Sequence, residues 1–349
     1  MKVEVLKDVE YPLLASFLNK IPQSLVYYSP VYKNFLENFL KEKATYFIIK
    51  EGEAIIALLP AVLKTNETYG NVLNSLPFYG SNGSILSLEF DPQINTVLIN
   101  AFHEFAVLHK CVSSTLITSP FESNIKWFDE NLDFTFKDQR IGQITKMSDT
   151  KEGLMDIYHS KTRNTVRKSL SGLKRIEYGN GLDYLDFIVE THKENLTAVN
   201  GLYKPKSCFE EIAKNFPYKD HLKIYIGFNE QDKPIAGLLN LYYNKTVEYF
   251  CPVTVSAYRD MQPLSGIIYQ AMQDAVDEGY QWWNWGGTWL SQGGVYQFKS
   301  RWGTADHDYF YYTKLYDNSV LELSPEILLR EYPYFYVLPF SALTKKEND

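Results

Sequence analysis

The chain has few cysteines and no long apolar run. Cys111, Cys208 and Cys251 are far apart and belong to no CxxC or Cys/His pattern, so reduced thiols in a cytoplasmic protein are expected. No run of about 18 apolar residues occurs, which excludes an apolar helix that spans a membrane. The first residues also contain no apolar core of signal-peptide length.

Several catalytic signatures are missing as well. The sequence contains no GxxxxGK[ST], no GxGxxG after a strand and no GxSxG, which argues against P-loop, dinucleotide-binding and serine-hydrolase chemistry. His192-Lys193-Glu194 and Asp306-His307-Asp308 come nearest to a metal or acid–base cluster, but neither has ligand spacing from a second segment, so no metal is expected. The net charge of −7 argues against a protein that nucleic acid covers extensively, and it leaves room for a local basic patch.

The order of the expected elements indicates two similar domains. Each half reads as helices, an antiparallel meander, a long helix, a strand, a short helix and a strand, without evident residue identity between the halves. Ser29-Pro30 predicts a helix start, and Glu51-Gly52 predicts a hairpin turn. In the second half we expect helices near 152–172, 183–199, 206–215 and 264–278. The predicted organisation is α/β (α+β), with domains 1–145 and 146–316 and a tail, 317–349, that packs back on them.

The most informative stretch runs from residue 281 to 303, QWWNWGGTWLSQGGVYQFKSRWG. Gly-Gly pairs among aromatic residues allow a ligand to approach the backbone closely, because no Cβ is in the way. Lys299 and Arg301 follow, between Phe298 and Trp302, and cations in such a turn suggest a site for an anionic group. The alternative is a tight loop that buries tryptophan and leaves the cations to water.

A second feature is the basic stretch 160–175, SKTRNTVRKSLSGLKR, which has six cations and no acid. Arg163, Arg167 and Lys174 would share a face of one helix. An uncompensated basic face in an acidic protein favours phosphate binding, although a solvated helix face would look the same.

Two loops and two carboxylates are weaker candidates. Arg259 precedes the helix expected at 264–278, whose N-terminus could hold a phosphate. Lys204 lies in a loop that either lines a cleft or caps a helix. Asp306 and Asp308 follow the cationic turn and could act as general bases, or form structural salt bridges.

Together these motifs resemble the FemA/FemB/FemX (FemAB) ligases, within the GNAT acyltransferase superfamily. The resemblance rests on a basic RxxxRK helix (Arg163, Arg167, Lys168), the strand end Asn284-Trp285-Gly286-Gly287 and the turn Phe298–Gly303. It covers about 146–315, and over 1–145 it is only topological. It implies two tandem GNAT-like domains, each a mixed, largely antiparallel sheet flanked by helices, with substrates held between them.

The resemblance also implies transfer of an acyl or aminoacyl group to an amine. In Fem ligases the donor is aminoacyl-tRNA and the acceptor is a peptidoglycan precursor; related enzymes use acyl-CoA. A long helical-hairpin arm found in some tRNA-using members is missing here, and so is the GNAT pyrophosphate loop. The sequence therefore leaves the donor open and slightly favours acyl-CoA, with no tightly bound cofactor.

Three functions remain open. The first is an N-acyltransferase acting on an amine of a phosphate-bearing sugar or of an envelope or surface-polysaccharide precursor. The second is a tRNA-dependent peptidoglycan-precursor ligase, and the third is a non-catalytic glycan- or nucleotide-binding protein. The expected catalytic residues are Lys299, Asp306 and Asp308. The expected substrate- or phosphate-binding residues are Arg163, Arg167, Lys168, Lys204, Arg259, Trp285, Gly286, Gly287, Tyr296 and Arg301.

Overall fold

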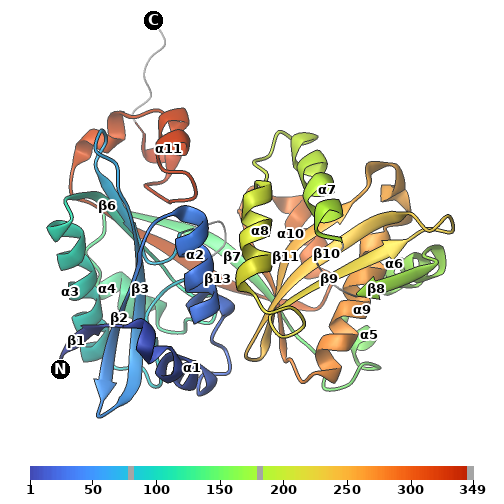
Figure 1. Cartoon of the computed structure of the whole chain (residues 1–349), viewed down its shortest axis with the longest axis horizontal. Coiled ribbons are helices and arrows are strands. Elements are labelled where there is room, and N and C mark those ends of the chain that lie inside the picture. Colours follow the sequence, from blue (N-terminus) through green and yellow to red (C-terminus); the bar gives the residue numbers. More distant parts are fainter. Residues whose placement is uncertain (78–81, 179–183, 344–349) are drawn as a thin grey trace, which may run out of the picture. The chain divides into compact units, whose positions relative to one another are not determined.

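The computed structural model describes residues 1–77, 82–178 and 184–343. Its contacts group the chain into two compact units. The first contains Met1–Ile21, Tyr27–Ile141 and Asp308–Asp349, and the second contains Pro22–Val26 and Gly142–His307. Each unit is built on a mixed sheet with helices on its faces (Figure 1), so the predicted fold class is confirmed. The predicted boundaries at 145 and 316 stay a prediction, and the tail beyond residue 343 lies outside the described residues.

The sheet of the first unit has the strand order β1-β2-β3-β4-β6-β13, with β5 beside β3. Its pairs are antiparallel except for β4 and β6, which are parallel. The strands are β1 (Val3–Val5), β2 (Ala44–Glu51), β3 (Ala54–Lys64), β4 (Asn71–Asn74), β5 (Leu86–Ser87), β6 (Cys111–Ile117) and β13 (Thr304–Leu315). A further strand, β7 (Phe136–Lys146), belongs to this unit only as far as Ile141. The chain passes from one unit to the other within β7 and again within β13.

Alternation along β2 separates the two faces of this sheet. Phe47 and Ile49 belong to a core cluster with helix α3 (Pro92–Leu108), whereas the hydroxyl of Tyr46 reaches the other face. That face is covered by helices α1 (Tyr11–Asn19) and α2 (Pro30–Leu40) (Figure 1). As predicted, α2 begins at Pro30, and the Ser29 hydroxyl caps it by accepting a hydrogen bond from the Tyr32 amide.

Two short helices complete the first unit. These are α4 (Ile125–Asn131) and α11 (Pro325–Glu331). The C-terminal segment packs on the sheet: Val320, Leu328, Tyr332 and Val337 form a buried cluster with Val72 of β4 and with β6.

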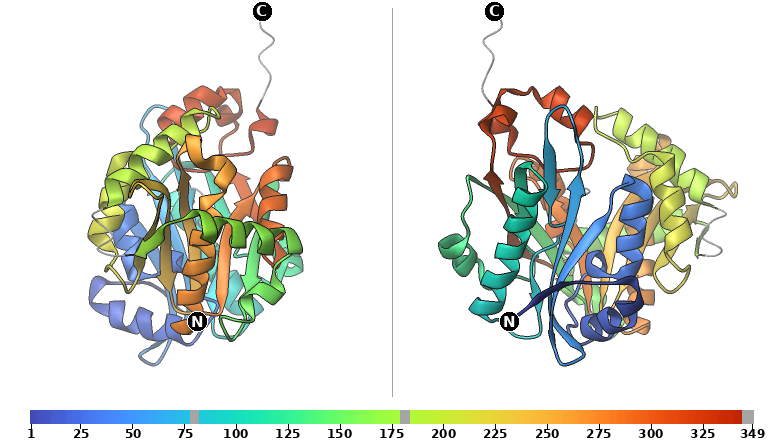
Figure 2. Two further views of the ribbon diagram at one scale, coloured as in Figure 1. Left: turned by 90° about the vertical axis from the view of Figure 1, so that its right-hand side faces the viewer. Right: turned by 60° about the vertical axis from the view of Figure 1, so that its left-hand side comes forward.

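The second unit has the strand order β12-β11-β10-β9-β8. The pairs from β8 to β11 are antiparallel, and β11 and β12 are parallel. In the left view of Figure 2, α6 and α9 lie on one face of this sheet and α7 and α8 on the other. The elements are α5 (Leu154–Ile157), α6 (Ser160–Gly172), β8 (Arg175–Tyr178), α7 (Leu185–Thr197), α8 (Lys206–Asn215), β9 (Leu222–Phe228), β10 (Pro234–Tyr243), β11 (Thr246–Thr254), α9 (Pro263–Asp277), β12 (Trp282–Thr288) and α10 (Gly293–Ser300).

The expected single helix at 152–172 was wrong, because the chain is extended at Tyr158 and His159 between α5 and α6. The Tyr158 ring is buried in the core of the second unit, where it meets Trp302 edge to face at 5.0 Å between ring centroids. Burial of this ring therefore overrides helix propensity, and His159 starts a new helix by accepting a hydrogen bond from the Lys161 amide.

The two parallel strand pairs differ in the number of residues over which the strands are paired. In the first unit, all four residues of β4 pair with β6. In the second unit, the described pairing joins β11 and β12 only at Thr246–Glu248 and Trp282–Asn284, although β11 continues to Thr254 and β12 to Thr288. The strand ends of the second unit are therefore not tied to each other by this ladder, and the site lies there.

Candidate functional site

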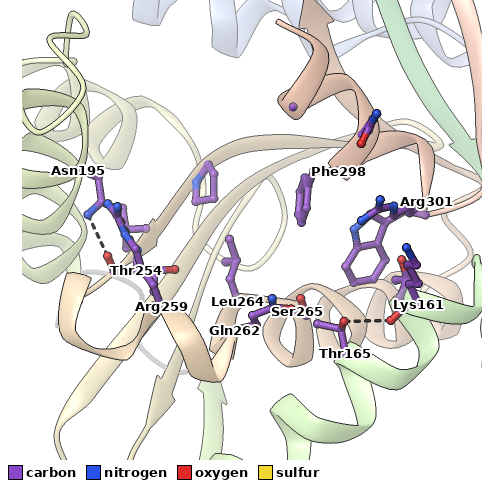
Figure 3. A pocket seen from close by; sticks show the side chains of 16 residues that line it. Lys161, Thr165, Asn195, Thr254, Arg259, Gln262, Leu264, Ser265, Phe298 and Arg301 are labelled. Atoms are coloured by element: carbon purple, nitrogen blue, oxygen red, sulfur yellow. Dashed lines mark hydrogen bonds between the residues drawn. The ribbon is translucent and has the colours of Figure 1, made fainter.

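A pocket of about 580 Å³ opens in the second unit, beside the carboxyl end of β11 (Figure 3). This volume lies within the usual range of small-molecule sites. Segments far apart in the sequence form its walls: the start of α6, the end of α7, the turn before α9, and α10. The described lining residues are Lys161, Thr162, Thr165, Asn195, Pro252, Val253, Thr254, Arg259, Gln262, Leu264, Ser265, Gly294, Gln297, Phe298, Arg301 and Trp302.

The charge of this pocket is positive. Lys161, Arg259 and Arg301 line it, and no Asp or Glu occurs among the described lining residues. In the part of the chain that the structure describes, none of these three side chains forms an ion pair. Cations that converge without a carboxylate repel one another, so an anionic ligand stabilises this arrangement.

The start of α9 adds partial positive charge. Gln262 adopts left-handed backbone angles and Pro263 is the first helical residue. The Ser265 amide donates to the Gln262 carbonyl and the Gly266 amide to the Ser169 hydroxyl, and Pro263 has no amide hydrogen. The dipole of the helix still gives this end a partial positive charge. Gln262, Leu264 and Ser265 bring this helix end to the pocket. The dipole of this helix end, next to three cations, favours an anionic group such as a phosphate.

Hydrogen bonds hold the pocket walls together. The Ser169 hydroxyl of α6 donates to the Pro263 carbonyl and accepts from the Gly266 amide of α9, at 3.0 and 2.9 Å. A Cβ on Gly266 would lie 2.8 Å from the Ser169 oxygen, so this close approach requires glycine. At the other end of α6, the His159 amide donates to the Arg301 carbonyl at 2.9 Å. These bonds fix Lys161 and Arg301 relative to α9.

Asn195 links α7 to the floor of the pocket. Its amide nitrogen donates to the Thr254 carbonyl at 2.8 Å, and its amide oxygen accepts from the Thr254 backbone amide at 3.0 Å. This reciprocal pair holds the last residue of β11, which the ladder with β12 does not reach. Asn195 therefore serves the structure of the wall.

The two Gly-Gly pairs take different roles. Gly286 has a φ of +73°, a conformation that favours glycine. A Cβ on Gly293 or on Gly294 would meet no atom within 4 Å, and Gly294 lines the pocket. The second pair thus leaves the start of α10 bare toward open space, as expected for a backbone that a ligand approaches.

Lys299 points away from the pocket. Its side chain is only 7% exposed, and its ammonium donates to the carbonyls of Gly286 and Gly287 at 3.3 and 3.2 Å and to the Thr288 hydroxyl at 2.9 Å. Burial lowers the pKa of Lys299 to about 8. The residue thus ties α10 to the end of β12, and its predicted catalytic role stays a prediction.

Apart from Arg301, the other residues predicted from the 281–308 region also lie outside the described lining. Trp285 is buried, and its indole nitrogen donates to the Thr145 hydroxyl at 2.9 Å. The Tyr296 hydroxyl donates to the Asp306 carboxylate at 2.6 Å, and both residues are at the surface. Asp308 is exposed and belongs to the first unit. Their catalytic and binding roles remain untested.

Only part of the basic stretch 160–175 forms the helical face that the sequence predicted. Helix α6 ends at Gly172, so Lys174 and Arg175 leave it, and both pair with Asp232. The predicted position of Lys174 on the helix was wrong because of a tertiary contact: its partner, Asp232, lies in the turn between β9 and β10. On the helix, Lys161 reaches the pocket.

The remaining cations of this prediction contact protein atoms. Arg163 donates to the Tyr158 carbonyl, Arg167 to the Asn164 amide oxygen and Lys168 to the Asp260 carbonyl. Lys204 lies 5.1 Å from the centroid of the Phe250 ring. Of the predicted site residues, the structure therefore brings Arg259 and Arg301 together in the pocket.

Sequence reasoning missed several lining residues. Lys161 was counted in the basic stretch without a site role. The predicted helix over 152–172 placed it in mid-helix, whereas α6 begins at Ser160, after its cap at His159. Phe298 was noted only as a flank of Lys299. Gln262 and Gln297 carry no sequence signal, because their place depends on how α9 and α10 pack.

The described residues contain no cluster of His, Cys, Asp and Glu that could hold a metal ion. Over the same residues, no helix is both long and apolar enough to cross a bilayer.

Part of the second unit resembles a known protein family. The FemAB family matches residues 183–309, which contain α7, β11, α9 and α10. A comparison with curated proteins found no match.

Solved structures share the fold over most of the chain at low identity. FemX matches with a TM-score of 0.73 and 12% identity, over 95% of this chain and 100% of FemX. L-PGS from Bacillus licheniformis matches with a TM-score of 0.53 and 11% identity, over 86% and 92%. A tandem GNAT protein from the clavulanic acid biosynthesis pathway matches with a TM-score of 0.52 and 8% identity, over 90% and 98%.

These likenesses show a fold shared with FemX and with a tandem GNAT protein. Through residues 183–309 the predicted FemAB resemblance is confirmed.

Proposed function

We propose that this protein is an N-acyltransferase whose second unit binds the phosphate-bearing part of the acyl donor in the pocket of Lys161, Arg259 and Arg301. One observation carries the proposal: three cations without a described ion pair line one pocket, together with the start of helix α9, where the helix dipole is positive. A donor such as acyl-CoA or aminoacyl-tRNA carries phosphates that fit this charge. An acceptor amine on a phosphate-bearing sugar or envelope precursor is the substrate class expected from the sequence.

The reaction needs little covalent chemistry from the protein. The amine nitrogen attacks the acyl carbonyl carbon, a C–N bond forms, and the C–S bond of a thioester or the C–O bond of an ester breaks. The leaving thiolate or alkoxide takes up a proton, and the amine loses one to solvent or to a carboxylate. Holding the donor by its phosphates supplies the effective concentration that speeds this step.

The surroundings of the pocket also suit the acyl end of such a donor. The start of α10 lies bare at Gly293 and Gly294, and the strands β11 and β12 are not paired beyond Glu248 and Asn284 in the described structure. The acyl end of a bound donor can therefore meet backbone groups of the open strand ends. Backbone amides there would stabilise the negative charge that develops on the carbonyl oxygen.

A thiol-release assay tests this proposal. Acetyl-CoA is mixed with a panel of amino sugars and amino acids, and CoA release is followed with and without each amine. Arg301→Gln and Arg259→Gln should raise KM for the donor about tenfold or more, because each removes a charged contact of about 1.5–3 kcal/mol. Arg330→Gln is the matched control, because Arg330 is exposed and pairs with Glu331 on α11.

The tRNA-dependent alternative has an observation of its own. Arg167 and Lys168 are exposed on α6, and no carboxylate partner is described for either within residues 1–77, 82–178 and 184–343. A nucleic acid could follow this row beyond the pocket. Salt-sensitive tRNA binding that Arg167→Gln and Lys168→Gln weaken would favour this donor, and turnover with acetyl-CoA would favour the other.

A further inference from the structure

Two turns of the second unit expose large apolar side chains to solvent. In the α7–α8 turn, Val199, Leu202 and Tyr203 are 66%, 65% and 44% exposed. In the β12–α10 turn, Trp289 and Leu290 are 55% and 64% exposed. All six tryptophans of the chain are described, and Trp289 is the one that is exposed. Apolar groups of this size are unfavourable in water, so their concentration in two turns indicates an interaction surface.

Both turns lie beside the pocket without being part of its described lining. Val199 follows the lining residue Asn195 by four residues, and Leu290 precedes the lining residue Gly294 by four. Four residues of extended chain span at most about 14 Å. In Figure 3, Asn195 of α7 and Phe298 of α10 lie on different sides of the pocket. The two turns are therefore joined to different walls of the pocket.

Hydrogen bonds fix the shape of both turns. The α7–α8 turn ends where the Lys204 amide donates to Nε2 of the buried His192 at 3.1 Å. In the β12–α10 turn, the Gln292 amide donates to the Trp289 carbonyl at 2.9 Å. The apolar side chains are thus presented by ordered backbone, which reduces the entropy that binding to a partner costs.

Neither turn carries an acid. Residues 195–209 contain two lysines and no acid, and residues 279–298 contain no charged side chain. Glu194 is the nearest acid along the chain to the α7–α8 turn. Beside it the Lys193 ammonium lies 5.8 Å from the centroid of the exposed Tyr203 ring. Together with the three cations of the pocket, this surface combines apolar side chains with positive charge.

A lipid bilayer with anionic headgroups fits both properties of this surface. Exposed apolar side chains enter the boundary between headgroups and acyl chains, while nearby lysines and arginines are attracted to the lipid phosphates. Tryptophan and tyrosine are the side chains that this boundary favours. A protein partner fits less well, because charged residues are depleted from the core of protein interfaces and here the apolar side chains come from two separate turns.

We propose that this surface of the second unit docks on an anionic bilayer, with Leu202, Trp289 and Leu290 inserted at the level of the headgroups. The inference goes beyond the proposed function, because it concerns a surface outside the pocket and holds for any donor. Docking brings the pocket to amines that are held at a membrane surface.

Co-sedimentation with lipid vesicles tests the proposal. The vesicles contain phosphatidylcholine alone or an equal mixture with phosphatidylglycerol. Wild type should sediment with the mixed vesicles, and less with phosphatidylcholine alone or at higher salt. The double variant Trp289→Ser, Leu290→Ser should bind about tenfold more weakly or less, because membrane affinity scales with the apolar area inserted. Leu202→Ser should also weaken binding.

The matched control removes apolar surface elsewhere. Val107 and Leu108, at the end of α3 in the first unit, are 63% and 75% exposed. The double variant Val107→Ser, Leu108→Ser should keep wild-type binding. An equal loss in this control would show adsorption through any exposed apolar group and would overturn the proposal.

Tryptophan fluorescence gives a second readout. Lipids with brominated acyl chains quench an indole that enters the bilayer, and Trp289 is the exposed tryptophan. Quenching should be seen for wild type and should largely disappear in Trp289→Phe, which keeps an aromatic ring and should still sediment. Quenching that persists in Trp289→Phe would contradict insertion of this turn.

The remaining outcomes are also decisive. If wild type does not sediment with the mixed vesicles, or if the variants of both turns sediment as wild type does, the proposal is overturned. A wild-type dimer in sedimentation velocity that Trp289→Ser, Leu290→Ser dissociates would assign the surface to a second copy instead. Circular dichroism checks that the variants fold. Titration of CoA without vesicles should give the same affinity for Leu202→Ser and wild type, so docking and donor binding fail or stand separately.

Discussion

Replacement of Lys299 by methionine separates a structural role from a chemical one. Methionine has similar length but no charge and no donor, so the carbonyls of Gly286 and Gly287 and the Thr288 hydroxyl lose the ammonium. A buried acceptor left without a partner costs about 1–3 kcal/mol. The apolar side chain recovers part of this loss, so we expect a loss of about 1–3 kcal/mol in the free energy of unfolding at pH 7.

The pH dependence of this loss is the sharper prediction. The pKa of Lys299 falls from its ordinary 10.5 to about 8 in the folded state. Between these values the unfolded chain binds a proton that the folded chain has released, so wild-type stability rises with pH in this window. The rise can reach about 1.4 kcal/mol per pH unit and about 3 kcal/mol in all. Lys299→Met lacks this group, so the gap between wild type and variant should widen from pH 8 to pH 10.5.

Urea denaturation followed by tryptophan fluorescence at pH 7, 8, 9 and 10 measures the gap. Lys126→Met is the control, because the Lys126 side chain is 88% exposed on α4, and it should show almost no gap at any pH. A gap for Lys299→Met that stays constant or narrows with rising pH would refute the reasoning. The folded variant also tests catalysis: if Lys299 acts in the chemical step, kcat falls while the affinity for the donor stays.

Other substitutions test the supports of the site. Gly303→Ala should destabilise the fold by about 2 kcal/mol or more, since Gly303 has a φ of +74° and a Cβ would lie 2.6 Å from the Ile157 carbonyl oxygen; thermal unfolding measures the loss. Ser169→Ala removes the hydroxyl that joins α6 to the start of α9 and should cost about 1–3 kcal/mol and raise KM for the donor; unchanged KM would show that this contact does not position the pocket. If either carboxylate is the general base, Asp306→Asn or Asp308→Asn should lower kcat, most strongly at low pH where solvent base is scarce. A full pH–rate profile measures this effect. Profiles like that of the wild type for both variants would remove both residues from the mechanism.

Local signals in the sequence were sufficient for several elements. Ser29 and Pro30 define a helix start within four residues, and Glu51-Gly52 defines a hairpin turn, because both depend on neighbouring backbone groups alone. The structure has α2 from Pro30 and a hairpin of β2 and β3 around Gly52.

Features set by tertiary packing could not be predicted in the same way. The helix break at Tyr158 follows from burial of one ring, and the partner of Arg175 is Asp232, which lies 57 residues away. Lys299 and Arg301 are two residues apart, yet one bonds to β12 and the other lines the pocket. The strand against which α10 packs decides which of these two cations is buried and which lines the pocket. The sequence does not show which strand that is.

Binding of a phosphate-bearing donor to the cationic pocket is the central claim, and calorimetric titration of CoA tests it most directly. The titrations use wild type and the triple variant Lys161→Gln, Arg259→Gln, Arg301→Gln at 50 and 200 mM salt. The account predicts that wild type binds, that higher salt weakens the binding, and that the triple variant loses at least a hundredfold while it stays folded. Binding of CoA to the folded triple variant with wild-type affinity would contradict the account.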